Sequence, residues 1–339
     1  MRILFVWTGV TSYMADCWRE LRRMDGVELK VIVEQTPSGS DFAAAEVLRD
    51  LDYLLVGPPT SSFQPSAFDF QPDAIFAGGW RSRNTRRVLS AFPNVPKVFC
   101  LDMPWRPSLR CVLARWVLRP FLRQFRRIYV PGEWTARYAR WLGFAPGRID
   151  RKLYSVRFDR FEGFDRRERK GFLYLGRFAP EKRTDLLVKA FARYRELGGT
   201  WTFDLYGAGD AIPLPSSLFP LPSVHPFVQP DELPQVYRDH ACLLMASAFD
   251  PWPLVVLEAT AAGLSVIASD HCGNGEELGA RRVPFGDVET MAREMLKVEL
   301  EWTKGGARPS AGLANSFAKE YDCAAWAKRT MEIARCLGV

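Results

Sequence analysis

The chain of 339 residues has only three histidines, His225, His240 and His271, and all of them lie in its second half. We expect them to serve at the surface or in packing rather than in chemistry. No apolar run reaches the roughly 20 residues that span a bilayer. The first residues, Arg2–Trp7, look like a buried strand and not like a secretory signal. These absences predict a chain without a membrane-spanning helix or a secretory signal.

Cysteine is present without a pattern. The seven cysteines are odd in number, scattered, and never spaced Cys-x-x-Cys. This argues against a disulfide framework or a zinc site. We expect reduced packing cysteines in a cytoplasmic protein. The one Asp-x-Asp, at Asp50–Asp52, lies in a charged segment outside any glycine-rich loop and is interpreted as a solvated turn.

The charge is unevenly distributed, although the overall composition of 47% hydrophobic and 25% charged residues is typical of globular proteins. Residues 1–165 hold 25 Lys and Arg against 17 Asp and Glu, while residues 166–339 hold 21 against 22. The whole excess of positive charge therefore belongs to the first half. The two halves are expected to meet different partners.

Short apolar segments alternate with segments of helical spacing, which predicts an α/β fold with parallel sheets covered on both faces. This alternation is interrupted by a charged linker near Phe158–Arg169 and then begins again. We expect two Rossmann-like domains, an N-terminal one over residues 1–160 and a C-terminal one over residues 161–312. A C-terminal helix over 313–339 is expected to return to the first domain. The expected strands and helices are Arg2–Trp7, Tyr13–Met24, Val27–Glu34, Ala74–Ala77, Lys97–Leu101, Arg127–Val130, Trp134–Leu142, Gly171–Leu175, Thr184–Leu197, Thr202–Tyr206, Asp231–Asp239, Ala241–Met245, Pro253–Ala262, Ser265–Ala268, Asp287–Val298 and Ser316–Cys336.

Two cations follow the first strand of the second half, in the pattern Gly176-Arg177-x4-Lys182. Gly176 lets the backbone turn closely past a ligand. Arg177 can form a two-pronged contact with phosphate oxygens, and Lys182 acts as a point charge. The cluster predicts a phosphate-binding turn, with a solvated basic turn as the alternative.

Two carboxylates follow about seventy residues later, in the pattern Asp250-x7-Glu258. Pro253 suits a first helical position, and the amides of Leu254 and Val255 would then point outward from a helix start that attracts phosphate. Glu258 lies within an otherwise apolar helix, where a carboxylate needs polar partners. Ribose hydroxyls are such partners, and a structural ion pair is the alternative.

These residues, with Ala268–Glu276 and the segment Asp-Glu-Leu-Pro-x2-Tyr within Pro230–Leu244, resemble the nucleotide-sugar site of retaining GT-B glycosyltransferases of family 4 (glycosyl transferases group 1). The likeness covers nearly all of the second half. In the first half it rests on the opening strand with Gly9 and on Val156–Phe161.

The resemblance implies that residues 1–160 form an acceptor-binding domain and residues 161–312 a nucleotide-sugar-binding domain. It also implies a role for each matching residue. Arg177 and Lys182 would hold a diphosphate, and Glu258 would bind ribose hydroxyls. Asp250 would meet hydroxyls of the transferred sugar, helped by backbone groups of Trp252, Pro253 and Leu254. Gly9 would let the first domain approach the phosphate.

The chain departs from the family pattern at several positions. The family usually has Glu at Asp250, Phe-Gly at Trp252-Pro253, Gly at Arg183 and a double glycine at Cys272-Gly273. Members often carry a histidine after a strand of the first domain, where this chain has Asp102. We expect Asp102 to meet the donor sugar or the acceptor hydroxyl, or else to serve as a turn residue.

Retention in this family implies front-face transfer without a protein nucleophile, a metal or a cofactor besides the donor substrate. Catalysis would then rest on Asp102, Arg177, Lys182 and Asp250. The alternatives are a nucleotide-sugar epimerase of the same fold and a non-catalytic nucleotide-sugar-binding protein.

A basic segment with interleaved apolar residues spans Trp105–Arg127 and includes Arg106, Arg110, Arg115 and Arg119. Such a segment suits an anionic membrane surface or a sugar- or lipid-linked acceptor. It suits equally a solvated face over core residues. No nucleic-acid motif accompanies it, so we do not expect nucleic acid as a partner.

Overall fold

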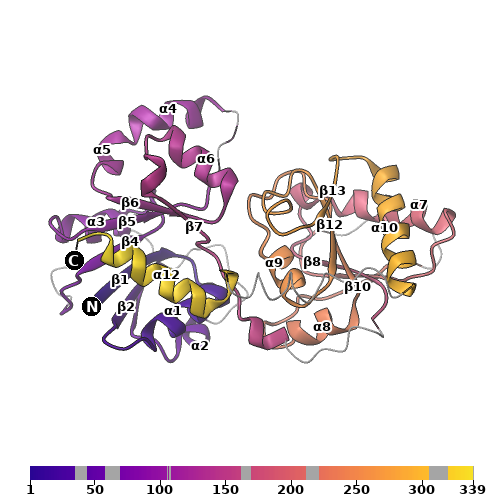
Figure 1. Cartoon of the computed structure of the whole chain (residues 1–339), viewed down its shortest axis with the longest axis horizontal. Coiled ribbons are helices and arrows are strands. Elements are labelled where there is room, and N and C mark those ends of the chain that lie inside the picture. The colour runs from indigo at the N-terminus through magenta and orange to yellow at the C-terminus, as the bar shows by residue number, and fades with distance from the viewer. Residues whose placement is uncertain are drawn as a thin grey trace. The chain divides into compact units, whose positions relative to one another are not determined.

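The computed structural model describes residues 1–34, 44–57, 69–104, 106, 108–161, 169–210, 221–304 and 320–338. Its contacts divide the chain into two compact units (Figure 1). The first comprises Met1–Val156 with Glu320–Val339, and the second comprises Arg157–Lys319. No helix among the described residues is long and apolar enough to cross a membrane.

The first unit is built on a seven-stranded parallel sheet in the order β3-β2-β1-β4-β5-β6-β7. Its strands are β1 Arg2–Thr8, β2 Glu28–Glu34, β3 Tyr53–Val56, β4 Ala74–Ala77, β5 Lys97–Cys100, β6 Arg127–Val130 and β7 Ile149–Arg151. The inner strands are buried on both faces, as near-continuous apolar runs require. In β1, Phe5 pairs in register with Val31 and Phe76 and stacks on the ring of Phe76 at a centroid distance of 4.9 Å.

The helices of this unit are α1 Ser12–Arg22, α2 Ala44–Leu48, α3 Arg83–Ala91, α4 Leu109–Val117, α5 Arg119–Leu122, α6 Glu133–Trp141 and α12 Cys323–Arg335, with a 3-10 turn η2 at Pro146–Arg148. The basic segment Trp105–Arg127 contains two helices, since the chain bends at Leu118 and Pro120 lies in the first turn of α5. Trp105 lies outside the described residues.

The last helix belongs to the first unit, where α12 packs on α1. Trp326 is buried there and its indole Nε1 donates to the carbonyl of Leu153 at 2.7 Å. Asp322 caps the helix by accepting from the amide of Ala324 at 2.8 Å. The helix expected over Ser316–Cys336 therefore begins later than expected, and residues 316–319 lie outside the described part of the chain.

The second unit holds a six-stranded parallel sheet in the order β10-β9-β8-β11-β12-β13. Its strands are β8 Phe172–Leu175, β9 Phe203–Tyr206, β10 Ser223–His225, β11 Cys242–Met245, β12 Ser265–Ser269 and β13 Arg281–Val283. Its helices are α7 Thr184–Glu196, α8 Leu233–Asp239, α9 Leu254–Ala261 and α10 Val288–Thr303, with 3-10 turns η3 Phe158–Phe161 and η4 Pro180–Lys182. The predicted α/β class with two parallel sheets is confirmed.

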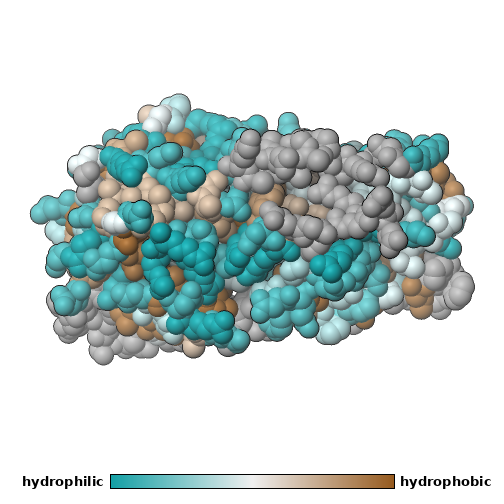
Figure 2. All heavy atoms as spheres, turned by 60° about the horizontal axis from the view of Figure 1, so that its bottom comes forward, coloured by the Kyte–Doolittle hydropathy of each residue, from teal (hydrophilic) through white to brown (hydrophobic). Residues whose placement is uncertain are grey.

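The surface has the usual mixture of residues. On the face shown in Figure 2, most of the coloured surface is hydrophilic, and hydrophobic residues lie in small groups among the polar ones. In both units the loops that follow the strands gather at the carboxyl edge of the sheet, where open parallel sheets bind ligands. Of the predicted donor residues, Gly9 follows β1 in the first unit, and the others lie in or just after these loops in the second unit.

Candidate functional site

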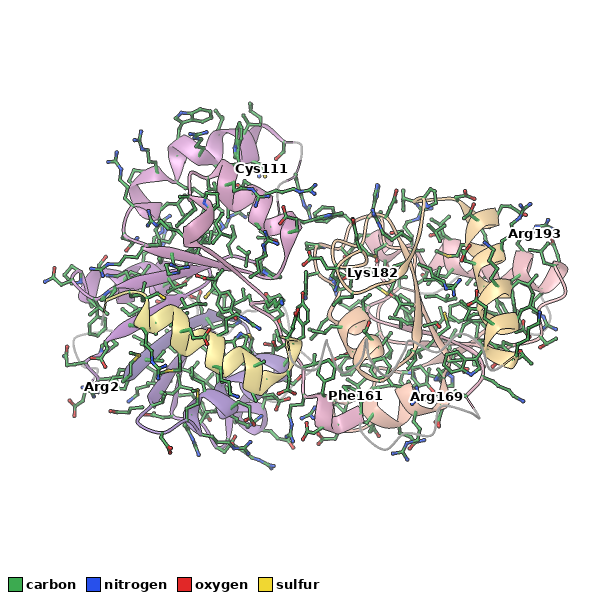
Figure 3. The ribbon with its side chains drawn as sticks, viewed as in Figure 1. Arg2, Cys111, Phe161, Arg169, Lys182 and Arg193 are labelled. Carbon is green, nitrogen blue, oxygen red and sulfur yellow. The ribbon has the colours of Figure 1, made fainter. Side chains whose placement is uncertain are left out.

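The two motifs of the second unit meet at the carboxyl edge of its sheet. Lys182 ends η4 after β8, and Asp250 lies in the loop after β11. Lys182 Nζ donates to Asp250 Oδ2 at 2.5 Å, and both side chains are largely buried. The amide of Ala248 donates to the carbonyl of Glu181 at 2.8 Å. Figure 3 labels Lys182 among these loops. The structure thus joins an ammonium and a carboxylate that lie 68 positions apart in the sequence.

The cationic turn is held by backbone contacts that need glycine. A side chain at Gly207 would place its Cβ only 1.9 Å from the carbonyl oxygen of Gly176. A Cβ at Gly209 would lie 2.3 Å from the carbonyl oxygen of Phe178. The Tyr174 hydroxyl donates to the carbonyl of Arg177 at 2.8 Å. The loop after β9 therefore supports the loop after β8 through close backbone packing.

Arg177 does not join the Lys182–Asp250 pair. Its side chain is 76% exposed, and its guanidinium lies 3.3 Å from Glu181. An exposed ion pair of this kind contributes little, on the order of 0–1 kcal/mol. Breaking the ion pair with Glu181 therefore costs little free energy, and the Arg177 guanidinium can bind another anion.

Arg183, where the family has glycine, adopts a left-handed conformation with φ of 51°. That region favours glycine, which explains the family preference. In this chain Arg183 forms a two-pronged ion pair with Asp185, with bonds of 2.8 and 2.9 Å. Arg183 directly follows Lys182 and is the N-cap residue of α7, and Asp185 lies in the first turn of that helix.

The loop that carries Asp250 is clamped by the loop after β12. The amide of Asp250 donates to the carbonyl of His271 at 3.1 Å, and the amide of Gly273 donates to the carbonyl of Asp250 at 2.8 Å. The buried Asn274 donates through Nδ2 to the carbonyl of Pro253 at 2.9 Å. The segment Cys272–Asn274 therefore positions both Asp250 and the start of α9.

Pro253 caps α9, so the expected helix start is confirmed within one residue. Trp252 beside it is buried, whereas Leu254 and Val255 are partly exposed. The first amides of a helix have no partner within the helix and attract anions. Leu254 and Val255 therefore present amides beside the Lys182–Asp250 pair, and Pro253, which has no N–H, removes one donor.

Glu258 lies one turn further along α9 and is held by a tyrosine. The Tyr237 hydroxyl donates to Glu258 Oε2 at 2.7 Å, and the Tyr237 ring meets Phe161 edge-on at 5.7 Å. Burial raises the pKa of the Glu258 carboxyl, against the opposing effects of the Tyr237 hydrogen bond and the charge of Arg160. Sequence reasoning assigned Tyr237 no role, although the Asp-Glu-Leu-Pro-x2-Tyr segment ends on it.

In the first unit, Gly9 and Asp102 follow strands at the carboxyl edge of the other sheet. Gly9 has a positive φ of 79°, and its amide donates to the carbonyl of Glu34 at 2.9 Å. Asp102 is exposed, and its Oδ2 accepts from the buried Tyr154 hydroxyl at 2.9 Å. Burial raises the pKa of Tyr154 well above its ordinary value, so this hydroxyl stays a donor. Tyr154 is a second supporting residue that carried no sequence signal.

The three histidines lie in hydrogen-bonded and ring contacts within the second unit. His225 and His240 approach the two carboxylate oxygens of Asp204 at 2.7 and 3.2 Å. Although burial alone would raise it, the pKa of Asp204 is lowered by these two hydrogen bonds. The ring of His271 stacks on Phe285 at 4.7 Å. Asp50 of the Asp-x-Asp segment lies in a turn and pairs with Arg19.

Two family models match the chain. One, described as glycosyl transferases group 1, matches residues 169–299. The other, described as a glycosyl transferase 4-like domain, matches residues 8–152. Together they cover most of both units. No curated protein matches the chain by sequence.

Solved structures resemble the whole chain at low identity. Anabaena HepE, in complex with UDP and glucose, is 15% identical with a TM-score of 0.74, covering 99% of this chain and 100% of its own. Sucrose-phosphate synthase from Thermosynechococcus elongatus is 16% identical with a TM-score of 0.74, covering 100% of this chain and 99% of its own. A lipopolysaccharide outer core galactosyltransferase, WaaB, is 14% identical with a TM-score of 0.69, covering 99% of both chains.

These likenesses confirm the predicted GT-B fold, in which both domains are Rossmann-like. The two family models fall on the two halves in the order that the sequence motifs indicated. The chain belongs to the group 1, family 4 glycosyltransferases.

Proposed function

We propose that the protein transfers a sugar from a nucleotide-sugar to a hydroxyl acceptor with retention of anomeric configuration. The observation that carries the proposal is the Lys182–Asp250 pair beside the start of α9. A nucleotide-sugar presents a diphosphate and sugar hydroxyls close together. A paired ammonium and carboxylate offer complementary partners to these two groups. The complexes of Anabaena HepE with UDP and with UDP-glucose support a donor of this class.

Each residue then has a defined task. Lys182, the exposed Arg177 and the first amides of α9 bind the diphosphate. Asp250 accepts hydrogen bonds from hydroxyls of the sugar, and Glu258, positioned by Tyr237, accepts them from the ribose. Gly9 is assigned to the phosphate because a glycine leaves its loop free of side-chain atoms.

The transfer proceeds on one face of the sugar. As the bond between the anomeric carbon and the phosphate oxygen breaks, the acceptor oxygen forms its bond on the same face, and the departing phosphate oxygen takes the acceptor's proton. Lys182, Arg177 and the α9 amides stabilise the negative charge that grows on the diphosphate. The protein's contribution is positioning and charge stabilisation, without a metal ion.

Asp102 acts at the acceptor or the donor sugar, since it is an exposed carboxylate fixed on one oxygen by Tyr154. Near it in the sequence, a pocket of about 340 Å³ is lined by Pro104, Trp134, Arg137 and Trp141. Aromatic walls of this kind suit a sugar ring. We propose a sugar- or lipid-linked acceptor in cell-envelope glycoconjugate synthesis, used at the cytoplasmic face of a membrane. The likeness to a lipopolysaccharide galactosyltransferase supports this class.

The test is incubation with UDP-, GDP- and ADP-sugars, first by thermal shift and then by product analysis with EDTA present. Release of the nucleoside diphosphate with a glycosylated acceptor of unchanged anomeric configuration supports the proposal. Conversion of the donor sugar alone indicates an epimerase, and binding without turnover indicates a binding protein. Lys182→Met should abolish donor stabilisation, whereas Lys189→Met, which removes an exposed lysine of α7, should not.

A further inference from the structure

A second pocket lies in the first unit, away from the carboxyl edge. It measures about 690 Å³ and is lined from α4, α5 and the segment between α6 and β7. Its residues Phe125 and Arg148 come just before β6 and β7 begin. They therefore lie at the amino edge of the parallel sheet, whereas Gly9 and Asp102 lie at the carboxyl edge. Figure 1 shows α5 at the end of this unit where the chain enters β1.

The pocket is strongly basic. Four arginines line it, namely Arg115, Arg119, Arg123 and Arg148. Within the described part of the chain, no carboxylate forms an ion pair with any of them. Arg148 is fixed in place by bonds to backbone carbonyls of Phe125 and Arg126 and lies over the ring of Phe144. Four guanidinium groups around one cavity repel one another and favour a bound anion.

Beside the pocket, α4 carries an apolar stripe that faces away from the core. Leu109, Leu113, Trp116 and Val117 are between 45% and 74% exposed. At about 100° per residue, they fall within roughly 100° of one another on the helix. The opposite face of α4 holds the buried Cys111, labelled in Figure 3, and Ala114, which packs on the core. The helix is therefore apolar on both faces, and only one face is covered.

The stripe and the pocket share a residue. Trp116 lines the pocket, is 57% exposed, and meets the exposed Trp141 of α6 edge-on at 6.5 Å. Arg115 lies over the ring of Trp141 at 5.8 Å. An apolar surface bordered by arginines and tryptophan matches the boundary between lipid headgroups and acyl chains. Bare apolar stripes of this kind on a monomer mark interaction surfaces.

We propose that this surface binds an anionic phospholipid membrane. A lipid phosphate occupies the four-arginine pocket, and the outward face of α4 enters the apolar boundary of the bilayer. The inference deepens the membrane location included in the proposed function and is independent of the donor site. Of the arginines expected from sequence, Arg115 and Arg119 line the pocket and Arg106 and Arg110 do not. Arg123, from the same basic segment, and Arg148, from outside it, complete the lining.

The test is co-sedimentation of the full chain with vesicles of phosphatidylcholine alone and with one third phosphatidylglycerol. The wild type is expected to sediment with the anionic vesicles only. Arg119→Gln/Arg123→Gln removes two charges from the pocket and should weaken binding about 30-fold. Arg49→Gln/Lys328→Gln removes two exposed charges elsewhere in the same unit and should change it little. Trp116→Ser/Val117→Ser should lower the binding that persists in 0.5 M salt.

Three outcomes overturn the inference. Equal binding of the wild type to both kinds of vesicle would show that the protein does not recognise the anionic headgroup. Equal loss of vesicle binding in the pocket variant and in the control variant would show that binding depends on net charge and not on the pocket. Thermal stabilisation by inorganic phosphate that requires Arg119 and Arg123, without any sedimentation, assigns the pocket to a soluble phosphorylated ligand instead. Because no nucleotide-sugar is used, none of these outcomes bears on donor transfer, and unfolding curves of each variant confirm that it is folded.

Discussion

Removing the partners of the Lys182–Asp250 pair one at a time tests the proposed donor site most directly. The two side chains are 18% and 11% exposed and are joined at 2.5 Å. Lys182→Met keeps most of the unbranched side chain but leaves Asp250 as a largely buried carboxylate without its cation. Loss of one partner from a fully buried pair costs about 3–5 kcal/mol. We discount this to about 2 kcal/mol because water still reaches both groups.

In a domain of this size, about 2 kcal/mol corresponds to a fall of roughly 4–8 °C in the melting temperature. Asp250→Asn should cost less, because an amide oxygen still accepts from the ammonium. In the double variant neither charge is stranded, so it should be more stable than the sum of the single changes predicts, by about 1 kcal/mol. The measurement is thermal unfolding of all four proteins.

Ligand binding separates the two partners further. Lys182→Met should weaken UDP binding about 10- to 150-fold, the value of one charge-assisted hydrogen bond. Asp250→Asn should strengthen UDP binding, since Lys182 no longer has a competing carboxylate, yet weaken the additional affinity that the sugar of UDP-glucose provides. Additive stabilities, or parallel changes in UDP and UDP-glucose affinity in Asp250→Asn, would refute this account of the site.

Three further predictions concern the supports of the site. Gly207→Ala should lower both the melting temperature and the UDP affinity, because the added Cβ would lie 1.9 Å from the Gly176 carbonyl oxygen. The control Gly147→Ala should change neither, since a Cβ there has nothing within 4 Å. Unchanged UDP affinity in Gly207→Ala would contradict the proposed support by the loop after β9. Arg183→Ala keeps the strained left-handed backbone and loses the ion pair with Asp185. Its free energy of unfolding, measured by calorimetry, should be about 1 kcal/mol lower than that of the wild type. It should also be about 1 kcal/mol lower than that of Arg183→Gly, in which the backbone strain is relieved. The raised pKa of Glu258 means that the folded chain binds the proton more tightly than the unfolded chain, so the free energy of unfolding falls as pH rises from the ordinary glutamate pKa through the raised pKa of the folded state. Glu258→Gln should flatten that part of the curve of stability against pH. An unchanged slope would show that Glu258 is not its source.

Sequence patterns located the inner strands of both sheets, because buried strands are continuous apolar runs. Ala74–Ala77 and Arg127–Val130 have the predicted bounds. The strands that the sequence did not indicate are the outer ones, β3, β7, β10 and β13. Outer strands have one neighbouring strand and are short. Ile149–Arg151 and Arg281–Val283 are also polar and have almost no apolar signal, whereas β3 is apolar but only four residues long. The pairing that makes them strands exists only in the folded sheet.

The site shows the same limit. Spacing identified Lys182, Asp250 and Glu258 because each is a charged residue near a strand end or in an apolar helix. It could not show that Lys182 pairs with Asp250, since that contact depends on two loops brought together by neighbouring strands. Although Tyr237 ends the Asp-Glu-Leu-Pro-x2-Tyr segment, the sequence assigned a role neither to it nor to Tyr154, because a buried tyrosine looks like any other core aromatic until its hydroxyl has a partner.

The substitution of aspartate for the family's glutamate at position 250 has a physical consequence. The backbone of Asp250 is fixed on both sides, by the carbonyl of His271 and the amide of Gly273. With one fewer rotatable bond than glutamate, its carboxylate has little freedom to leave Lys182. The chain therefore holds this anion and cation in contact without a ligand. If the proposed donor site is right, a donor has to displace this contact by satisfying both groups together. A nucleoside diphosphate would satisfy only Lys182 and a nucleotide-sugar both, so the proposal predicts that the shorter side chain favours the intact donor over the spent product.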